Sequence, residues 1–469
     1  MKFGKKLGIL VLVIYFLFLS FTRFFNLETT ARLVWDESSD LVRMRELYQH
    51  PKITLIGPMS EDGVKVFGSL SYYLTLPFVV LFNFDPVSSA YATAFFGVVA
   101  VLLMMWFLKK TNLNVVYGGL LLLVSFPLLE ASRWAWNPHF IPFWQTLGLL
   151  GFGVGGSMGL IASGLFFGLT FHNHYYGLFA LVGMMGVIVF YSKRKIRDFL
   201  LYLLGVGIAL VPFVIFDLTH LPGLFITRLI YFGPLSGAGV GLGMVSMVNN
   251  LAKLPLQFAT YLAGQNAGIG MIVLLVSGIN MLFTWRHKNF KWLLPVLAQL
   301  LGLSLIGGGI YNHYLLPAVI FYYLWILGTF EKNFLSKFMV GLLIVSNLWS
   351  LKQELQKNDW STNIKATKEI VEIMATEAKN SNKKFNIAVL GSPDPNTKGR
   401  RYRDLLNLRD IHTTPEVDYS STDVFFVSYL NWSELKNDAS YEINEFRNKK
   451  PSASWEIENS KWKVYLLRK

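Results

Sequence analysis

The sequence contains no cysteine. That absence excludes disulfide bonds, thiolate metal sites and a cysteine nucleophile. Acidic residues are also few, since 29 aspartates and glutamates stand against 43 lysines and arginines, a formal net charge of +14. No patch of mixed basic and aromatic residues stands out as a surface for nucleic acid, so nucleic acid is not an expected partner.

Charged residues are sparse before residue 352, where long apolar runs follow one another. About 20 apolar residues suffice for a helix to cross a bilayer. The first run is long for a signal-peptide core and no cleavage site follows it, so we expect a retained signal anchor. The pattern predicts about eleven transmembrane helices, at 7–26, 87–108, 114–130, 138–155, 158–172, 175–192, 198–217, 268–285, 291–309, 313–330 and 335–351.

Short clusters of lysine and arginine separate these runs, as in cytoplasmic loops of membrane proteins. Segment 69–84 is apolar enough to be a span, but a helix lying at the outer interface keeps every basic cluster inside. We therefore expect a plasma-membrane protein with a cytoplasmic N-terminus and a first outer loop over 27–86. The C-terminal domain is then extracytoplasmic.

Residues 352–469 lose the long apolar runs and read as a small α/β domain. A helical apolar rhythm covers 364–378, and short β-rich runs predict strands at 385–390, 423–430 and 462–467. The predicted fold is mainly α: a polytopic membrane region over 1–351 with a small C-terminal α/β domain.

Glycines in this sequence have structural rather than nucleotide-binding explanations. Gly151, Gly155, Gly159, Gly164 and Gly168 recur mostly at four-residue spacing, which lets membrane helices approach closely. The run at 237–243 lacks the G-x-G-x-x-G spacing and follows no strand, so it predicts a flexible outer loop.

The first outer loop carries the most distinctive acids, Asp36, Glu37 and Asp40. Asp36 and Asp40 are four residues apart and would share one face of a helix. A solvated acidic loop is the alternative explanation. A second acidic pair, Glu61 and Asp62, equally fits a turn.

Other polar residues gather at the expected outer ends of the spans. Each taken alone fits an interfacial anchor, but together these cations and donors could hold a phosphate group. A histidine metal site is a weaker alternative because spacing does not show that the rings converge. We predict no metal, with a divalent ion as the alternative. The group comprises Arg133, Asn137, His139, His172, Asn173, His174, Asp217, His220, Arg228, Tyr311, Asn312, His313 and Tyr314.

Four features resemble one known family. They are the Asp-Glu pair at 36–37, Tyr72-Tyr73 in the interfacial helix, the motif Ser-Arg-Trp-Ala-Trp-Asn-Pro at 132–138 and the motif Asn-His-Tyr-Leu-Leu-Pro at 312–317. The chain resembles the GT-C superfamily of integral membrane glycosyltransferases over about residues 7–350. Its nearest likeness is to the protein O-mannosyltransferase and aminoarabinose-transferase branch.

The resemblance implies a sugar donor carried on a polyprenyl phosphate and transfer with inversion. By analogy Asp36 is the general base, and Glu37 or Asp40 orients the base or the acceptor. Arg133, Arg228 and His313 would stabilise the leaving phosphate. The full set of expected substrate-binding residues is Glu61, Asp62, Tyr72, Tyr73, Arg133, His172, His174, His220, Arg228, Tyr311, His313 and Tyr314.

The chain departs from the family at 68–71, where Gly-Ser-Leu-Ser replaces a Gly-His-Pro-Pro-type segment. The acceptor, whether protein, lipid or glycan, therefore does not carry over. A transporter or flippase for a lipid-linked glycan is an alternative, although the sequence shows no clear internal repeat. Two further alternatives are a non-catalytic membrane scaffold and a polysaccharide polymerase of another membrane class.

Overall fold

The computed structural model describes residues 2–59, 66–225, 244–306, 309–381, 384–391, 398–419, 422–446 and 448–469. The chain forms two compact units, each built from separate stretches of sequence. The membrane unit comprises Met1–Phe25, Ile53–Leu74 and Ala92–Leu355, and the tail unit comprises Asn26–Lys52, Thr75–Tyr91 and Gln356–Lys469. The tail unit thus takes in much of the first outer loop, which the sequence assigned to the membrane region.

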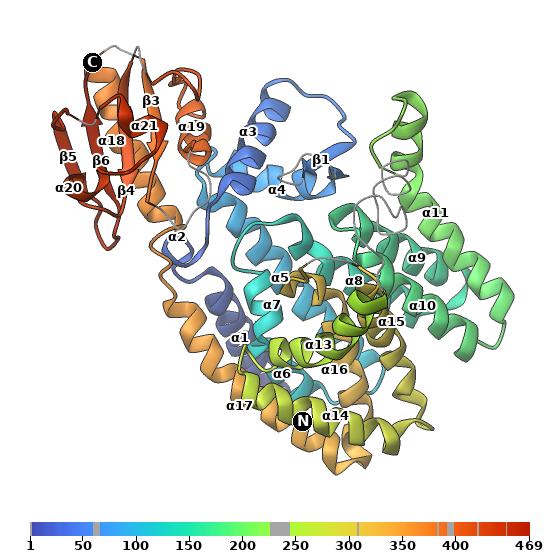
Figure 1. Cartoon of the computed structure of the whole chain (residues 1–469). Coiled ribbons are helices and arrows are strands. Elements are labelled where there is room, and N and C mark those ends of the chain that lie inside the picture. The colour runs from blue at the N-terminus through green and yellow to red at the C-terminus, as the bar shows by residue number, and fades with distance from the viewer. Residues whose placement is uncertain are drawn as a thin grey trace. The chain divides into compact units, whose positions relative to one another are not determined.

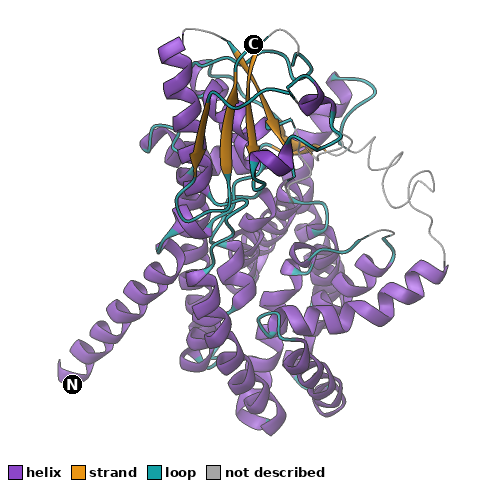
Figure 2. Ribbon diagram, turned by 60° about the vertical axis from the view of Figure 1, so that its left-hand side comes forward, coloured by secondary structure: helices purple, strands orange, loops and turns teal. Residues whose placement is uncertain are grey.

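Helices make up nearly all of the membrane unit, as Figures 1 and 2 show. Among its described residues, the membrane unit has one two-stranded hairpin, formed by β1 (Ile56–Met59) and β2 (Val66–Gly68). Its helices, some of which begin in the tail unit's stretches or end there, are α1 (Lys2–Phe24), α4 (Leu70–Leu81), α5 (Val87–Lys110), α6 (Val115–Val124), α7 (Phe126–Ala131), η1 (Asn137–Phe140), α8 (Ile141–Val154), α9 (Gly156–Asn173), α10 (Gly177–Tyr191), α11 (Lys195–Thr219), α13 (Met244–Leu262), α14 (Ala267–Thr284), η2 (Lys288–Trp292), α15 (Leu293–Ser304), η3 (Asn312–Tyr314), α16 (Leu316–Thr329), η4 (Phe330–Lys332) and α17 (Phe334–Gln356).

Each predicted span corresponds to a helix, with two differences. The span expected at 114–130 is broken between α6 and α7, because Ser125 has a non-helical ψ of 113° and Pro127 cannot donate a backbone hydrogen bond. The connection expected at 218–267 contains α13, whose sequence is not a continuous apolar run because two asparagines and Lys253 interrupt it. The glycine run at 237–243 lies outside the described residues.

Four described helices are long and apolar enough to cross a membrane, namely α5, α11, α14 and α17. Shorter apolar helices occur at Gly8–Phe24, Leu70–Leu81, Val115–Val124 and Gly177–Tyr191. The count of about eleven spans stays a prediction.

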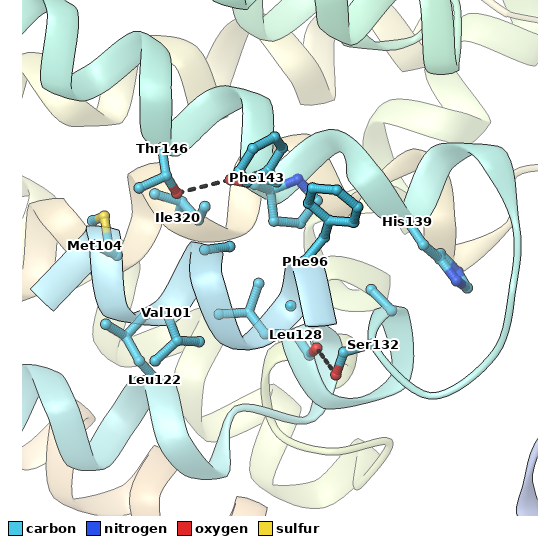
Figure 3. Close-up of a pocket in the computed structure, with 14 residues that line it drawn as sticks. Phe96, Val101, Met104, Leu122, Leu128, Ser132, His139, Phe143, Thr146 and Ile320 are labelled. Atoms are coloured by element: carbon cyan, nitrogen blue, oxygen red, sulfur yellow. Dashed lines mark hydrogen bonds between the residues drawn. The ribbon is translucent and has the colours of Figure 1, made fainter. Parts of the chain in front are cut away.

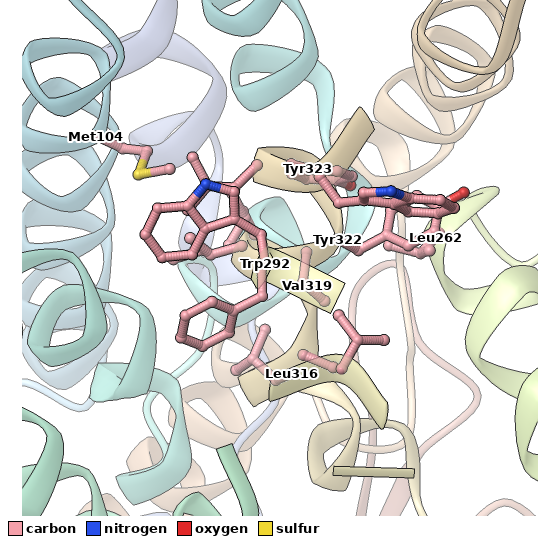
Figure 4. Packing of buried hydrophobic residues seen from close by; sticks show 14 of the residues in the cluster. Met104, Leu262, Trp292, Leu316, Val319, Tyr322 and Tyr323 are labelled. Atoms are coloured by element: carbon pink, nitrogen blue, oxygen red, sulfur yellow. The ribbon is translucent and has the colours of Figure 1, made fainter. Parts of the chain in front are cut away.

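The core of the membrane unit surrounds α16, almost every residue of which is buried. Figure 4 shows Trp292, Tyr322 and Tyr323 packed among aliphatic side chains of this cluster. The phenol groups find hydroxyl partners, since Tyr323 lies 2.8 Å from the Ser125 hydroxyl and Tyr322 lies 2.7 Å from that of Ser277. Each of these two buried phenol groups therefore has a hydrogen-bond partner, as polar groups in a protein interior usually do.

Close contact between helices explains the spaced glycines. A Cβ atom added to Gly164 would lie 2.0 Å from the backbone oxygen of Tyr202 on α11, and one added to Gly168 would lie 2.5 Å from Ala209 Cβ. The predicted role in helix approach is confirmed for Gly151, Gly159, Gly164 and Gly168 and is wrong for Gly155, where an added Cβ would meet nothing within 4 Å. Gly155 has another reason to be glycine, because its φ of +70° ends α8.

The tail unit contains a four-stranded sheet in the order β3-β4-β6-β5. β3 (Phe385–Val389) and β4 (Asp423–Ser428) are parallel, whereas β6 (Lys463–Leu467) pairs antiparallel with β4 and with β5 (Ala453–Glu456). Both faces of β3 and β4 are buried. The three predicted strands and the predicted helix, α18 (Ile364–Ser381), are confirmed; β5 was not predicted.

The remaining helices of the tail unit come from two stretches that are far apart in the sequence. They are α2 (Leu27–Thr30), α3 (Trp35–Gln49), α19 (Arg400–Asn407), α20 (Trp432–Leu435) and α21 (Tyr441–Asn444). The Lys368 ammonium on α18 lies 2.7 Å from a carboxylate oxygen of Glu28 and 2.7 Å from one of Asp85. One lysine therefore ties α18 to both stretches of the unit that come from before residue 92. Figure 1 shows α19 beside α3.

Candidate functional site

An aromatic–histidine cluster forms in the membrane unit where several connections between helices meet. We define it as Phe67, Trp136, His139, Tyr176, His174, Tyr311, His313 and Tyr314. The His313 ring lies 4.1 Å from Trp136 and 5.4 Å from His174, measured between centroids. His174 lies 5.0 Å from Phe67. Residues from 67 to 314 in the sequence are thus brought into one group.

Buried amides fix the segments that carry these rings. Asn137 and Asn173 each donate a side-chain hydrogen bond to the other's backbone oxygen, which joins the segment before α8 to the end of α9. The Gln299 amide on α15 donates to the Tyr314 backbone oxygen at 2.7 Å. Because a buried amide left unpaired is costly, these bonds hold the loops in one arrangement.

The cluster combines imidazoles with aromatic faces at the ends of apolar helices. His174 is buried, whereas His139 and His313 are half-buried. The His139 Nδ1 atom lies 2.9 Å from the Trp134 backbone oxygen, which favours the tautomer that donates there. Imidazoles can donate to phosphate oxygens and the rings offer apolar faces. Among the described residues no group of three histidine, aspartate or glutamate side chains could hold a metal ion.

A small cavity in the membrane unit has the His139 side chain on its wall. Figure 3 shows its other labelled walls, which are mostly apolar side chains such as Phe96, Val101 and Met104. Its two hydroxyls are already bonded, Ser132 to the Leu128 oxygen at 2.9 Å and Thr146 to the Pro142 oxygen at 2.7 Å. The cavity therefore offers little to a polar ligand.

Arg133 does not join the cluster. It is fully buried, and its guanidinium donates to the backbone oxygens of Thr22, at 2.6 Å, and Phe25, at 2.8 Å. Those oxygens belong to the last turn of α1 and the residue after it, where helix carbonyls lack intrahelical partners. The structure thus gives Arg133 the role of capping α1.

Two further predicted histidines pack against α11 residues. His172 is buried, bonds the Ala209 oxygen through Nε2 at 2.6 Å and stacks on Phe213. His220 is exposed and stacks on Phe216 with ring centroids 4.3 Å apart.

Of the remaining expected binding residues, the structure describes the two tyrosines of α4. Tyr72 is buried, and the Tyr73 hydroxyl bonds both the amide and the oxygen of Thr54. Glu61, Asp62 and Arg228 lie outside the described residues.

The acids of the first loop lie in the tail unit, at the start of α3. As expected from the sequence, this helix places Asp36 and Asp40 one turn apart on a shared face. Glu37 is buried and accepts a hydrogen bond of 2.7 Å from the Val34 amide, with Arg32 3.3 Å from its other oxygen. Glu37 therefore caps the helix, while Asp36 and Asp40 are half-buried.

α19 packs against this first turn. The Ser38 hydroxyl donates to Asp404 Oδ2 at 2.6 Å, and the Arg400 guanidinium lies 4.7 Å from the centre of the Trp35 ring. Arg401, which is buried, donates to the Leu33 oxygen at 3.3 Å. These partners were missed because no catalytic motif marks 400–407, although the i, i+3, i+4 spacing of Tyr402, Leu405 and Leu406 would have shown an amphipathic helix.

Burial raises the pKa of Asp404 to about 6. The hydrogen bond from Ser38 and the charge of Arg400 oppose that rise, whereas Glu416 adds to it. An aspartate in the unfolded chain titrates near about 3.9. The folded state therefore holds the Asp404 proton more tightly, and ionising this carboxyl weakens folding as pH rises through this interval.

We expect Asp404→Asn to change how stability depends on pH. Wild type should lose stability relative to the variant as pH rises from about 4 to about 7, and the difference should be constant below about pH 4. Thermal unfolding in detergent across this range measures it, with Asp410→Asn as the control because Asp410 is exposed. Parallel curves of stability against pH for wild type and Asp404→Asn would contradict the raised pKa of Asp404.

Comparison with known proteins shows a likeness to solved structures of ArnT. ArnT from Cupriavidus metallidurans in the apo state is 11% identical over 99% of this chain and 97% of that chain, with a TM-score of 0.57. The same protein bound to undecaprenyl phosphate is 11% identical over 99% of this chain and 98% of that chain, with a TM-score of 0.58. No family model and no curated protein sequence matches the chain.

The likeness extends over both units and shows the fold. The predicted architecture, a mainly helical multi-pass membrane protein with a small C-terminal sheet, is confirmed, and the fold is consistent with the resemblance to the GT-C superfamily drawn from the sequence.

Proposed function

We propose that the chain is a membrane glycosyltransferase that takes its sugar from a polyprenyl-phosphate donor. The observation that carries this proposal is the fold, shared over nearly the whole chain with a protein whose structure holds undecaprenyl phosphate. The aromatic–histidine cluster supports it, since it gathers imidazoles and rings that suit a phosphate group and an adjoining sugar.

In the proposed reaction an acceptor hydroxyl attacks the anomeric carbon in a single displacement with inversion. The new bond forms from the acceptor oxygen while the bond from the anomeric carbon to the phosphate oxygen breaks, releasing polyprenyl phosphate. Asp36 takes the acceptor proton, and the first turn of α3 favours the negative charge that a base needs. The released phosphate is already anionic, so no proton is required for it to leave.

The other proposed roles are supported by the aromatic–histidine cluster and by the position of α3 at the start of the first outer loop. His174 and His313 are proposed to donate to the donor's phosphate, and Tyr311 and Tyr314 to contact the lipid-linked sugar. Asp40 is proposed to orient the acceptor. The sugar is a hexose or a pentose, and the reaction takes place on the outer face of the plasma membrane, with the N-terminus cytoplasmic and the tail unit extracytoplasmic.

The direct test supplies purified protein with radiolabelled polyprenyl-phosphate sugars and membrane extract as the source of acceptor. Labelled acceptor together with released polyprenyl phosphate is the expected result. Binding of the carrier with no transfer from any sugar would contradict the proposal and favour a transporter or flippase.

We expect His313→Ala to weaken binding of undecaprenyl phosphate by about tenfold, because one charge-assisted hydrogen bond contributes on the order of 1.4 kcal/mol or more. Titration of the purified protein in nanodiscs with the labelled lipid measures the change. His412→Ala is the matched control, since His412 is an exposed residue of the tail unit. Equal affinity for all three proteins would remove His313 from the phosphate site.

A further inference from the structure

C-terminal residues of the tail unit contact the chain on both sides of Asp36. The positioning role inferred for them rests on the proposed function, in which Asp36 is the general base. Three residues before Asp36, and just ahead of α3, the Leu33 amide donates to the Thr362 oxygen at 2.6 Å, and the Leu33 oxygen accepts from Arg401. Two residues after Asp36, the buried Ser38 hydroxyl reaches Asp404. The one turn of helix that carries the proposed base is thus held by residues more than 300 positions later in the sequence.

These contacts are stronger than typical surface contacts. The Ser38 hydrogen bond has a carboxylate acceptor and a length of 2.6 Å, in the range of charge-assisted bonds. The Arg400 guanidinium lies over the half-buried Trp35 ring and is held there by Glu416 at 3.2 Å. A stacked cation and a charged hydrogen bond together constrain the side chains that flank Asp36.

The buried apolar side chains of α3 do not belong to its first turn. The helix has 15 residues and its sequence is polar, with only Leu41, Met44 and Leu47 as buried apolar side chains. A helix of this length is marginal in isolation. All three apolar anchors lie beyond the first turn, which is held instead by the bond between the Val34 amide and Glu37 and by the contacts with α19.

We propose that Asp404 and Ser38 are positioning residues, through which the tail unit fixes the Asp36 carboxylate for proton transfer. Asp404 acts through Ser38, and Ser38 through the helix turn it shares with Asp36. A displacement of about 1 Å at a reacting group can cost on the order of 100-fold in rate. The C-terminal stretch of the tail unit, Gln356–Lys469, then contributes to catalysis, although no motif in that stretch reveals it.

The experiment compares Ser38→Ala, Asp404→Ala and Asp404→Asn in the full-length protein in nanodiscs. Both alanine variants are expected to lower kcat on the order of 10-fold to 100-fold with KM unchanged, because positioning affects the transition state rather than substrate binding. Asp404→Asn should recover most of the rate, since its amide oxygen can still accept from Ser38. The double alanine variant should lose no more than either single one.

Hydrogen exchange supplies a readout that needs no enzyme activity. The amides of residues 36–40 should exchange on the order of tenfold faster in both alanine variants, without change across the rest of the tail unit. The control is Asp410→Asn, which removes the ion pair with Arg45 at 2.9 Å, nine residues beyond Asp36. Its kcat and its exchange over 36–40 should equal those of wild type.

Two results would overturn the inference. One is a wild-type kcat and wild-type exchange in Ser38→Ala and Asp404→Ala, in a protein where Asp36→Asn is inactive. The other is faster exchange throughout the tail unit in the alanine variants, since that shows general loosening. If wild type itself transfers no sugar, the proposed function fails, and exchange over 36–40 still tests whether Asp404 holds the helix.

Discussion

Asp36→Asn is expected to lower sugar transfer by a factor on the order of 10² to 10⁴, with the protein folded and the donor still bound. A positioned general base contributes this much to proton transfer, and an amide of the same shape cannot accept the proton. Asp36 lies in the first turn of α3, where the helix dipole favours the ionised form of a carboxyl group. The substitution removes that charge and keeps the side-chain volume.

The measurement is single-turnover transfer from a radiolabelled polyprenyl-phosphate sugar, with folding checked by thermal unfolding. Glu37→Gln is the matched control. Its side chain caps the helix through the Val34 amide, and glutamine keeps an oxygen that can accept that bond. We expect this variant to retain most of its activity. Equal transfer by wild type and Asp36→Asn would exclude Asp36 as the base.

Arg133→Ala is expected to destabilise the membrane unit by about 3–5 kcal/mol, the usual result of removing one member of a buried charged network. Arg133 is fully buried, donates to two backbone oxygens at the end of α1, and interacts electrostatically with the buried Glu354. Alanine leaves those carbonyls without their donor, and buried carbonyls without a partner are costly. Little folded protein should be recovered from membranes.

Yield and thermal unfolding in detergent measure this effect. Arg286→Ala is the control, because Arg286 is exposed and lies over the ring of the neighbouring Trp285. The same assay separates capping from phosphate binding. A variant Arg133→Ala that unfolds like wild type but binds undecaprenyl phosphate poorly would contradict the capping role and restore Arg133 as a phosphate ligand.

The two predictions concern residues that looked alike in the sequence, since both belong to short polar motifs beside apolar runs. Burial separates them. Arg133 lies under the last turn of α1, where its guanidinium donates to backbone oxygens, whereas Asp36 lies half-buried on a helix surface. A motif reports which residue types are present, but only packing determines whether a charged group meets solvent or a carbonyl.

The sequence by itself determined most of the architecture: helices over the predicted spans, one of them broken at Ser125, a C-terminal sheet with three of its strands, and close contact at the glycines within α8 and α9. Apolar runs, alternation and small-residue spacing are local signals, so one stretch suffices to read them. Tertiary structure decided what depends on distant partners. Trp136, His174 and His313 meet because three connections converge, and Ser38 meets Asp404 across 366 positions. No local pattern encodes such pairs, because the energy that selects them is that of packing the whole unit.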